Sequence, residues 1–228
     1  MKWRGLEEAE AAAQCTTLQE ELEQRKSLAE QYVPAATQAI HRQTIDSLRT
    51  SGIARHSLPV GAKAPSFELP DQNGKLLSSA SLLRGSKVVI CFFRGRWCPF
   101  CVAQMEAMNR IHPQIKKAGA ELIAISPQTV RQGFFMHDQH GIHFPLLSDA
   151  NSQVARQFGL VYRVPEPQQQ IYSTTFVNLP FINGDDSWEL PVPGTYILGR
   201  EHEVLYASVD PDYTRRPEPA EILSALAG

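Results

Sequence analysis

One segment near the middle of the chain constrains the fold more than any other. An apolar run, residues 88–93, is followed by Arg-Gly-Arg-Trp-Cys-Pro-Phe-Cys at residues 94–101, and helix-forming residues begin at Val102. This order predicts a buried strand, a tight loop and a helix. The first turn of that helix holds both Cys98 and Cys101.

The position of the two cysteines predicts their chemistry. Backbone N–H groups at the start of a helix favour negative charge, and the thiolate is the reactive form of cysteine. Such a position lowers a cysteine pKa from about 8.5 to roughly 7 in Cys-x-x-Cys motifs. Arg94 and Arg96 are expected to act in the same direction, with Trp97 beside them. We interpret the pair as a redox-active dithiol.

Two structural roles for the pair are weaker alternatives. A zinc site needs four ligands, usually from two such pairs, and the remaining cysteines, Cys15 and Cys91, do not form a second pair. A purely structural disulfide across two residues would close almost no loop of the unfolded chain. We expect Cys91, inside the apolar run, to be a buried and inert thiol. Neither a metal nor another cofactor is predicted, since the chain has no phosphate loop and no Gly-x-Gly-x-x-Gly fingerprint.

Composition limits the possible partners and location. The 228 residues are 43% hydrophobic and carry a net charge of −2, which gives no electrostatic case for binding nucleic acid or a membrane. No apolar stretch approaches the roughly 20 residues of a membrane helix, and the N-terminus lacks the pattern of a signal peptide. We therefore expect a cytoplasmic protein, in a compartment that keeps the dithiol reduced.

The chain divides into two parts that differ in their pattern of apolar and charged residues. Residues 1–57 combine periodic apolar residues with many charged ones, which predicts a helix over about 6–33, ended by Pro34, and a second helix over about 35–50. This helical N-terminal arm could pack on its own domain or form a contact between two copies in a homodimer. The sequence leaves both possibilities open.

Residues 58–228 predict one α/β domain of alternating strands and helices. Strands are expected at about 67–69, 87–93, 120–126, 144–147, 195–199 and 203–208. Helices are expected at about 79–83, 98–111, 128–140, 152–158 and from 220 onward. Pro113 should kink or break the second of these helices near His112, before it resumes to Lys117.

Residues 165–190 form an additional stretch within this domain. Its prolines indicate a long excursion, but its apolar residues, Phe176 and Trp188 among them, exclude a free linker. It could be a β-hairpin that covers the edge of the sheet, or a lid or partner surface near the dithiol.

Two framework motifs carry a family resemblance that covers about residues 58–227. The pattern Phe-Pro-Leu-Leu-Ser-Asp occupies residues 144–149, before a short helix. The other is Gly61-x-x-Ala64-Pro65-x-Phe67-x-Leu69-x-Asp71-x-x-Gly74-Lys75. Both resemble the alkyl hydroperoxide reductase and thiol-specific antioxidant family, that is, peroxiredoxins. The resemblance implies a thioredoxin fold, a central mixed β-sheet flanked by helices, here with an N-terminal helical extension.

At the active site the chain departs from that family. The peroxiredoxin pattern Pro-x-x-x-Thr-x-x-Cys ends in the cysteine that attacks peroxide. Aligned on it, Cys101 takes the attacking position, Cys98 replaces the threonine and Arg94 replaces the proline. Pro193 stands where the family has an arginine. Threonine and arginine would ordinarily orient the peroxide and stabilise charge on its oxygens.

The same segment also resembles thioredoxin, whose active site is Trp-Cys-x-x-Cys. Thioredoxin has a cis-proline just before a strand that faces the disulfide, and residues 192–196, with Pro193 and Thr195, match that segment. This resemblance implies that Cys98, at an exposed start of the helix, attacks first and that Cys101 resolves the mixed disulfide. The two resemblances therefore nominate different attacking cysteines.

Two functions follow from these resemblances. The first is a thiol-dependent peroxidase that reduces hydrogen peroxide or organic hydroperoxides through Cys98 and Cys101 and is recycled by a thioredoxin-type donor. The second is a thiol–disulfide oxidoreductase that acts on protein disulfides. A non-enzymatic redox sensor, in which the arm reports the state of the dithiol, is a third option. The segment Tyr-Thr-Arg-Arg at residues 213–216 matches no motif, and we expect it to be a surface loop.

Overall fold

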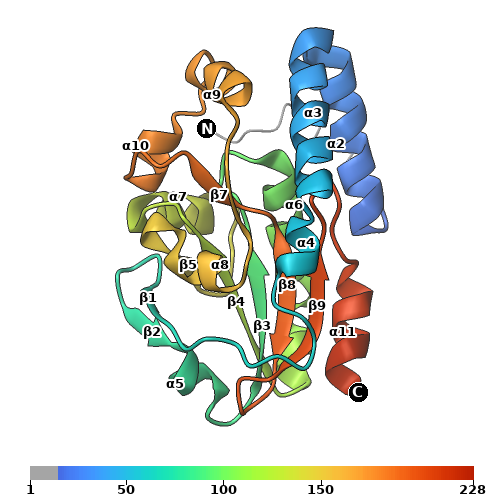
Figure 1. Cartoon of the computed structure of the whole chain (residues 1–228). Helices are drawn as coiled ribbons and strands as arrows, with labels where there is room; N and C mark the ends of the chain where they lie inside the picture. The colour runs from blue at the N-terminus through green and yellow to red at the C-terminus, as the bar shows by residue number, and fades with distance from the viewer. Residues whose placement is uncertain (1–14) are drawn as a thin grey trace.

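The computed structural model describes residues 15–228, so the first part of the predicted helix 6–33 lies outside the described residues. The centre of the structure is a five-stranded sheet (Figure 1). Its strands, in spatial order, are β5 (Leu146–Ser148), β4 (Ala120–Ser126), β3 (Lys87–Phe92), β8 (Gly194–Leu198) and β9 (Val204–Val209). Strands β3, β4 and β5 run parallel, whereas β8 and β9 are antiparallel to their neighbours. This mixed sheet confirms the predicted α/β class.

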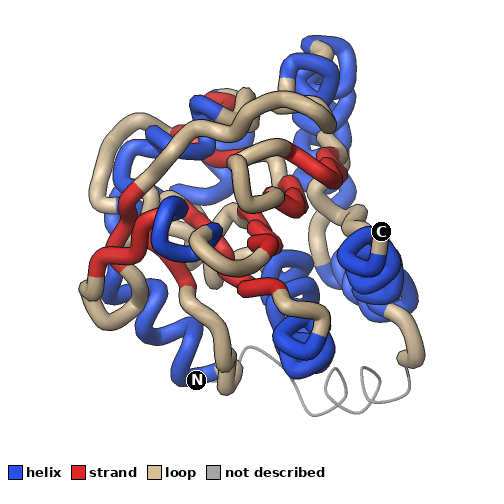
Figure 2. The backbone as a smooth tube through the Cα atoms, turned by 90° about the horizontal axis from the view of Figure 1, so that it is seen from below, coloured by secondary structure: helices blue, strands red, loops and turns tan. Residues whose placement is uncertain are grey.

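The remaining elements surround this sheet, with helices on both sides of the strands (Figure 2). Two short antiparallel pairs lie outside it: β1 (Glu68–Pro70) with β2 (Leu76–Ser78), and β6 (Val161–Arg163) with β7 (Glu189–Pro191). The helices are α2 (Leu18–Tyr32), α3 (Ala35–Ser51), α4 (Ile53–His56), α5 (Ser79–Leu83), α6 (Pro99–Lys117), α7 (Val130–Gln139), α8 (Gln153–Gln157), α9 (Glu166–Ser173), α10 (Leu179–Asn183) and α11 (Pro219–Ala227), with a 3-10 turn at Ala150–Ser152. Over the described residues, none of these helices is both long and apolar enough to cross a membrane.

Strand β3 is apolar on both faces because the sheet is covered on both. Val89 and Cys91 face the core that includes α6, whereas Val88, Ile90 and Phe92 belong to the second core, beneath the β1–β2 hairpin and α8. Successive side chains of a strand point to opposite faces, so a continuous apolar run fills both cores at once. The strand ends where α6 must begin, and this junction positions the dithiol.

Helix α6 runs without interruption from Pro99 to Lys117, so the predicted break near His112 is wrong. Pro113 lies inside the helix and removes one backbone donor. Ile115, beyond the proline, is fully buried in the core. Its packing holds the last turn in place despite the missing hydrogen bond.

The described part of the N-terminal arm packs into the main core. Leu18 and Leu22 of α2 and Ile45 and Leu48 of α3 are buried in the same cluster as α6. Helix α2 lies against α6, and α3 lies against α9. This packing favours the arm as part of its own domain, and a dimer contact stays a prediction.

Both ends of the described chain meet at the start of α2. Thr17 and Glu20 form a reciprocal capping box there. The carboxylate of Glu218 adds a cap from the other end of the chain, accepting hydrogen bonds from the backbone N–H groups of Leu18 (3.1 Å) and Gln19 (2.7 Å). Four N–H groups at a helix start lack partners within the helix, and this carboxylate satisfies two of them.

Residues 165–190 contain helices α9 and α10, so a β-hairpin over this stretch is a wrong expectation. The chain leaves β6, forms both helices and returns as β7, which pairs with β6. The buried side chains of α9, Gln168 and Tyr172, face inward. This stretch therefore brings Tyr172 against Trp97, next to the dithiol. Its role as a lid or a partner surface stays a prediction.

The packing of α2 predicts a measurable contribution to stability. Leu22→Ala should lower the free energy of unfolding by about 2–5 kcal/mol, because it leaves a cavity between α2 and α6. Lys26→Ala, on the exposed side of the same helix, should change it by no more than about 0.5 kcal/mol. Urea unfolding followed by circular dichroism measures both values. Equal stability of the two variants would mean that the arm is not part of the core.

Candidate active site

The two cysteines occupy the start of α6, as the sequence predicts. Cys98 is the extended residue that precedes the helix, Pro99 is the first helical residue, and Cys101 lies in the first turn. Proline suits that position because its missing N–H would have no partner there. Both cysteines are free thiols.

The predicted exposure of Cys98 is wrong, because both sulfurs are buried. Cys98 is 1% exposed and Cys101 is 0% exposed. Trp97, next to Cys98, packs edge-on against Tyr172 of α9, with 5.2 Å between ring centroids. An aromatic side chain from outside the motif therefore packs beside the dithiol, and the motif itself gave no sign of it.

The environment shifts the pKa values of the two thiols in opposite directions. Burial raises the pKa of Cys101, but the hydrogen bond from Cys98 and the positive charges of Arg216 and Arg94 outweigh it and lower that pKa to about 5. Burial raises the pKa of Cys98 well above its usual range, and the hydrogen bond that it donates to Cys101 raises it further. The environment therefore favours the thiolate form of Cys101 and the thiol form of Cys98.

Arg216 is the site residue that the sequence did not predict. The expected surface loop at 213–216 is wrong at two positions: Arg216 is 9% exposed and Tyr213 is 7% exposed. The Nη2 atom of Arg216 lies 3.4 Å from the Cys101 sulfur. A cation separated from Cys101 by 115 residues of sequence thus contacts the thiolate.

A buried hydrogen-bond network fixes Arg216. Its Nε donates to Oε1 of Gln104 (2.6 Å), and its Nη1 donates to the carbonyls of Tyr213 and Arg215. Gln104 in turn donates from Nε2 to the hydroxyl of Thr195 (3.1 Å). Thr195 is therefore linked to Cys101 through Gln104 and Arg216, and its role in the site stays a prediction.

Arg94 is a second buried cation beside the dithiol. Its guanidinium carbon lies 4.7 Å from the ring centre of Trp97 and 4.0 Å from that of Tyr213. Its Nη2 donates to the hydroxyl of Tyr172. Within residues 15–228, no carboxylate forms a salt bridge with Arg94 or Arg216. The electrostatic role predicted for Arg94 therefore has a geometric basis.

The side chain of Arg96 is directed toward α7 and not toward the dithiol. Its Nε donates to Oε1 of Gln132 on α7 (2.6 Å), and its backbone N–H donates to Gln128. It does not appear among the charges that shift the pKa of either thiol. Of the two arginines in the motif, only Arg94 faces the sulfurs.

The cis-proline expected at Pro193 is wrong. The described residues contain no cis peptide bond, so Val192–Pro193 is trans. The chain passes here from β7 into β8, and the N–H of Val192 is held by the carbonyl of Leu160 (2.8 Å). An extended passage of this kind needs no tight turn, which is where cis-prolines are usually found. The resemblance to thioredoxin fails at this position.

Cys91 lies behind the site, paired in register with Thr195. It is fully buried, and burial raises its pKa to about 12. The expectation of a buried thiol is confirmed, and such a pKa keeps the sulfur protonated and unreactive at neutral pH.

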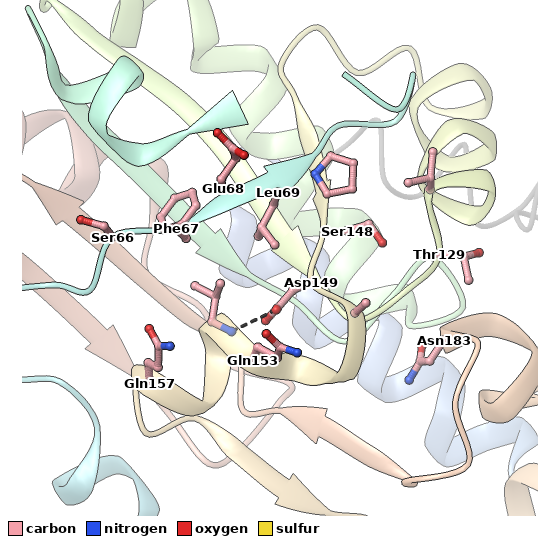
Figure 3. A pocket seen from close by; sticks show the side chains of 14 residues that line it. Ser66, Phe67, Glu68, Leu69, Thr129, Ser148, Asp149, Gln153, Gln157 and Asn183 are labelled. Atoms are coloured by element: carbon pink, nitrogen blue, oxygen red, sulfur yellow. Dashed lines mark hydrogen bonds between the residues drawn. The ribbon is translucent and has the colours of Figure 1, made fainter. Parts of the chain in front are cut away.

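Two of the cavities in the described structure differ in whether residues of the dithiol network line them. The larger, of about 570 Å³, lies between β1, the start of α7 and α8, with Glu68, Asp149 and Asn183 among its lining residues (Figure 3). No cysteine lines it. The smaller, of about 310 Å³, is lined by Pro193, Thr195 and Arg216 among others, and so reaches the network around Cys101.

Comparison with known proteins now identifies the family. Residues 60–207 match the model of the AhpC/TSA family. The chain belongs to this family. It is 32% identical over 124 residues to a putative peroxiredoxin bcp of Coxiella burnetii, an alignment that covers 53% of this chain and 82% of that protein. The chain spans only 46–64% of the length of the plant peroxiredoxin Q relatives that it matches.

Solved structures confirm the fold of this AhpC/TSA family member. The peroxidoxin BcpB of Mycobacterium tuberculosis superposes with a TM-score of 0.59 at 22% identity, over 75% of this chain and 97% of that one. A bacterioferritin comigratory protein of Xanthomonas campestris, whose structure is described in terms of alkyl peroxide reduction, gives a TM-score of 0.54 at 19% identity, over 71% and 90%. The predicted thioredoxin fold and peroxiredoxin resemblance are confirmed, and the relatives indicate a thiol peroxidase.

The opposite pKa shifts of the two thiols predict that the reduced protein loses one thiolate in a step at acidic pH. Absorbance of the reduced protein near 240 nm should fall by one thiolate as the pH drops through about 5, because Cys101 takes up its proton there. Cys101→Ser should show no thiolate at pH 7, because the pKa of Cys98 is raised. Cys98→Ala should shift the step upward, because the hydrogen-bond donor is lost. A single step near pH 8–9, as in a free cysteine, would contradict this assignment.

Proposed function

We propose that this chain reduces hydrogen peroxide or organic hydroperoxides with Cys101 as the attacking thiolate and Cys98 as the resolving thiol. Membership of the AhpC/TSA family supports the reaction class. The observation that carries the order of attack is the guanidinium of Arg216 against the Cys101 sulfur, 3.4 Å away. A nearby cation favours the thiolate, which is the form that attacks peroxide.

The reaction has two steps at these residues. In the first, the Cys101 thiolate attacks one peroxide oxygen and the O–O bond breaks. Cys101 becomes a sulfenic acid, and the second oxygen leaves as hydroxide or alkoxide and takes a proton from water. In the second, the Cys98 sulfur attacks the sulfur of Cys101, and a disulfide forms as water leaves. A thioredoxin-type dithiol donor then supplies two electrons to restore both thiols.

Burial of the pair supports peroxide as substrate over a protein disulfide. A protein disulfide needs an exposed attacking sulfur, and Cys98 is 1% exposed with a pKa raised by burial. Pro193, the residue that would resemble the substrate-facing proline of thioredoxin, is preceded by a trans bond. A small peroxide needs far less access than a folded protein does.

The donor and the location belong to the same proposal. Reduction of the disulfide by a cytoplasmic thioredoxin-type protein would complete the cycle in a reducing compartment. The fully buried disulfide would have to become accessible to that donor. Helix α9 and residues 210–217, which cover the site, are the segments whose displacement would expose it.

Stopped-flow oxidation by hydrogen peroxide, followed by Trp97 fluorescence, tests the reaction and its order. The reduced protein should react at least about 10²-fold faster than free cysteine, roughly what one preorganised transition-state donor contributes. Cys98→Ser should keep this fast step and stop at the sulfenic acid. Cys101→Ser should lose it, whereas Cys91→Ser serves as the matched control and should behave as the unmodified protein.

Either of two results would overturn the proposal. A reduced protein no faster than free cysteine would exclude the peroxidase, and disulfide exchange would become the function to pursue. Fast oxidation that survives in Cys101→Ser but not in Cys98→Ser would reverse the order of attack.

A further inference from the structure

The smaller cavity shares Arg216 with the dithiol site. It measures about 310 Å³, and its lining residues are Gln19, Pro193, Thr195, Ser208, Asp210, Arg215, Arg216, Pro217 and Glu221. Cys101 does not line it and is 0% exposed. Arg216 therefore lines the cavity and also contacts the Cys101 sulfur.

The walls of this cavity come largely from outside the segment that matches the family. That match covers residues 60–207. Gln19 comes from α2 in the N-terminal arm, Glu221 comes from α11, and residues 215–217 come from the segment between β9 and α11. The cap that Glu218 places on α2 holds the arm against this segment. The chain thus builds the cavity from its own two ends.

Arg216 has the geometry of a preorganised donor. Its guanidinium carries five N–H groups in a rigid fork. Nε and Nη1 are occupied by Gln104 and by two carbonyls, while Nη2 faces the Cys101 sulfur. The side chain is 9% exposed, so its charge acts in a largely dehydrated site, where electrostatic interactions are stronger than in water.

We propose that this cavity is the peroxide-binding pocket and that Arg216 is the catalytic residue that holds the peroxide against Cys101. The inference rests on the proposed peroxidase function. Peroxide enters from the side of β8 and β9 and replaces the direct contact between Arg216 and the sulfur. Arg216 then donates to the peroxide oxygens while the thiolate attacks one of them, and its charge stabilises the oxygen that leaves. Arg216 thereby supplies the orientation and charge stabilisation that a threonine and an arginine provide in the typical family pattern. Cys98 and Pro193 occupy those two positions in this chain.

The walls also indicate which peroxides fit. Seven of the nine lining residues are polar. Asp210 is paired with Arg215 (3.8 Å), and the carboxylate of Glu221 accepts from the hydroxyl of Tyr206 (2.7 Å). A polar pocket of about 310 Å³ suits hydrogen peroxide and small hydroperoxides. It disfavours long apolar hydroperoxides such as those of fatty acids.

Two substitutions test the two parts of this proposal. Arg216→Met removes the donors but keeps much of the side-chain volume, and Arg216→Lys keeps the charge without the fork. Ser208→Trp fills the pocket and leaves the Arg216 side chain itself unchanged. Leu205→Trp is its matched control, because Leu205 lies on the same strand, is 40% exposed and does not line the pocket.

The rates are measured by stopped flow with hydrogen peroxide and with tert-butyl hydroperoxide, at a pH where absorbance shows Cys101 to be a thiolate in every variant. Alkylation by iodoacetamide at the same pH reports the reactivity of the thiolate itself. We expect Arg216→Met to slow peroxide oxidation by about 10²–10³-fold, the usual effect of removing one transition-state donor. Alkylation should change less than about threefold, and Arg216→Lys should be intermediate. Ser208→Trp should slow tert-butyl hydroperoxide at least about tenfold more than Leu205→Trp does.

The outcomes separate this proposal from the function on which it rests. If the unmodified protein is fast and both Arg216→Met and Ser208→Trp remain equally fast, the peroxidase stands and the pocket assignment is overturned. Equal loss of peroxide oxidation and alkylation in Arg216→Met would also overturn it, because Arg216 would then support only the reactivity of the thiolate. An unmodified protein as slow as free cysteine would reject both proposals.

Discussion

Two buried guanidinium groups, neither of which has a carboxylate salt bridge within residues 15–228, set the conditions for the rest of this site. Removing a charge from water costs several kcal/mol unless an opposite charge or good hydrogen bonds compensate. Aromatic faces and a phenol solvate Arg94, and amide and carbonyl oxygens solvate Arg216. The negative charge that both cations share is the thiolate of Cys101. Burial of the site therefore supports the reactivity of Cys101, because a site without water strengthens the attraction between the two cations and the thiolate.

Local sequence signals predicted the elements that depend on local physics. The apolar run at 88–93 became a strand covered on both faces, and the turn at 71–75 formed where Asp71 accepts from the N–H groups of Asn73 and Lys75. The break at Pro113 failed because a local penalty was outweighed by the distant packing of Ile115. The hairpin at 165–190 failed for a related reason. Helices α9 and α10 bury side chains against partners, α3 among them, that the segment's own sequence does not reveal.

The candidate site also contains residues that the local sequence predicted and residues that it did not. The motif placed Cys98 and Cys101 at a helix start, because strand, loop and helix are consecutive in sequence. It could not show which sulfur is ionised, since that depends on Arg216, which reaches the site from the far end of the chain. Arg96 looked equivalent to Arg94 in sequence, but the direction of each side chain was set by Gln132 on one side and by Tyr172 and Tyr213 on the other. A single buried cation also has no periodicity or spacing by which to recognise it.

The cap that Glu218 places on α2 has a consequence for how this protein can vary. The carboxylate joins residues about 200 positions apart, and it lies two residues after Arg216. Losing the arm would leave that carboxylate without its two N–H partners, and losing the last segment would leave the helix start bare. The two ends are therefore expected to be inherited or lost together. Relatives that share only the central 148 residues would need another group in place of the contact that Arg216 makes with the sulfur.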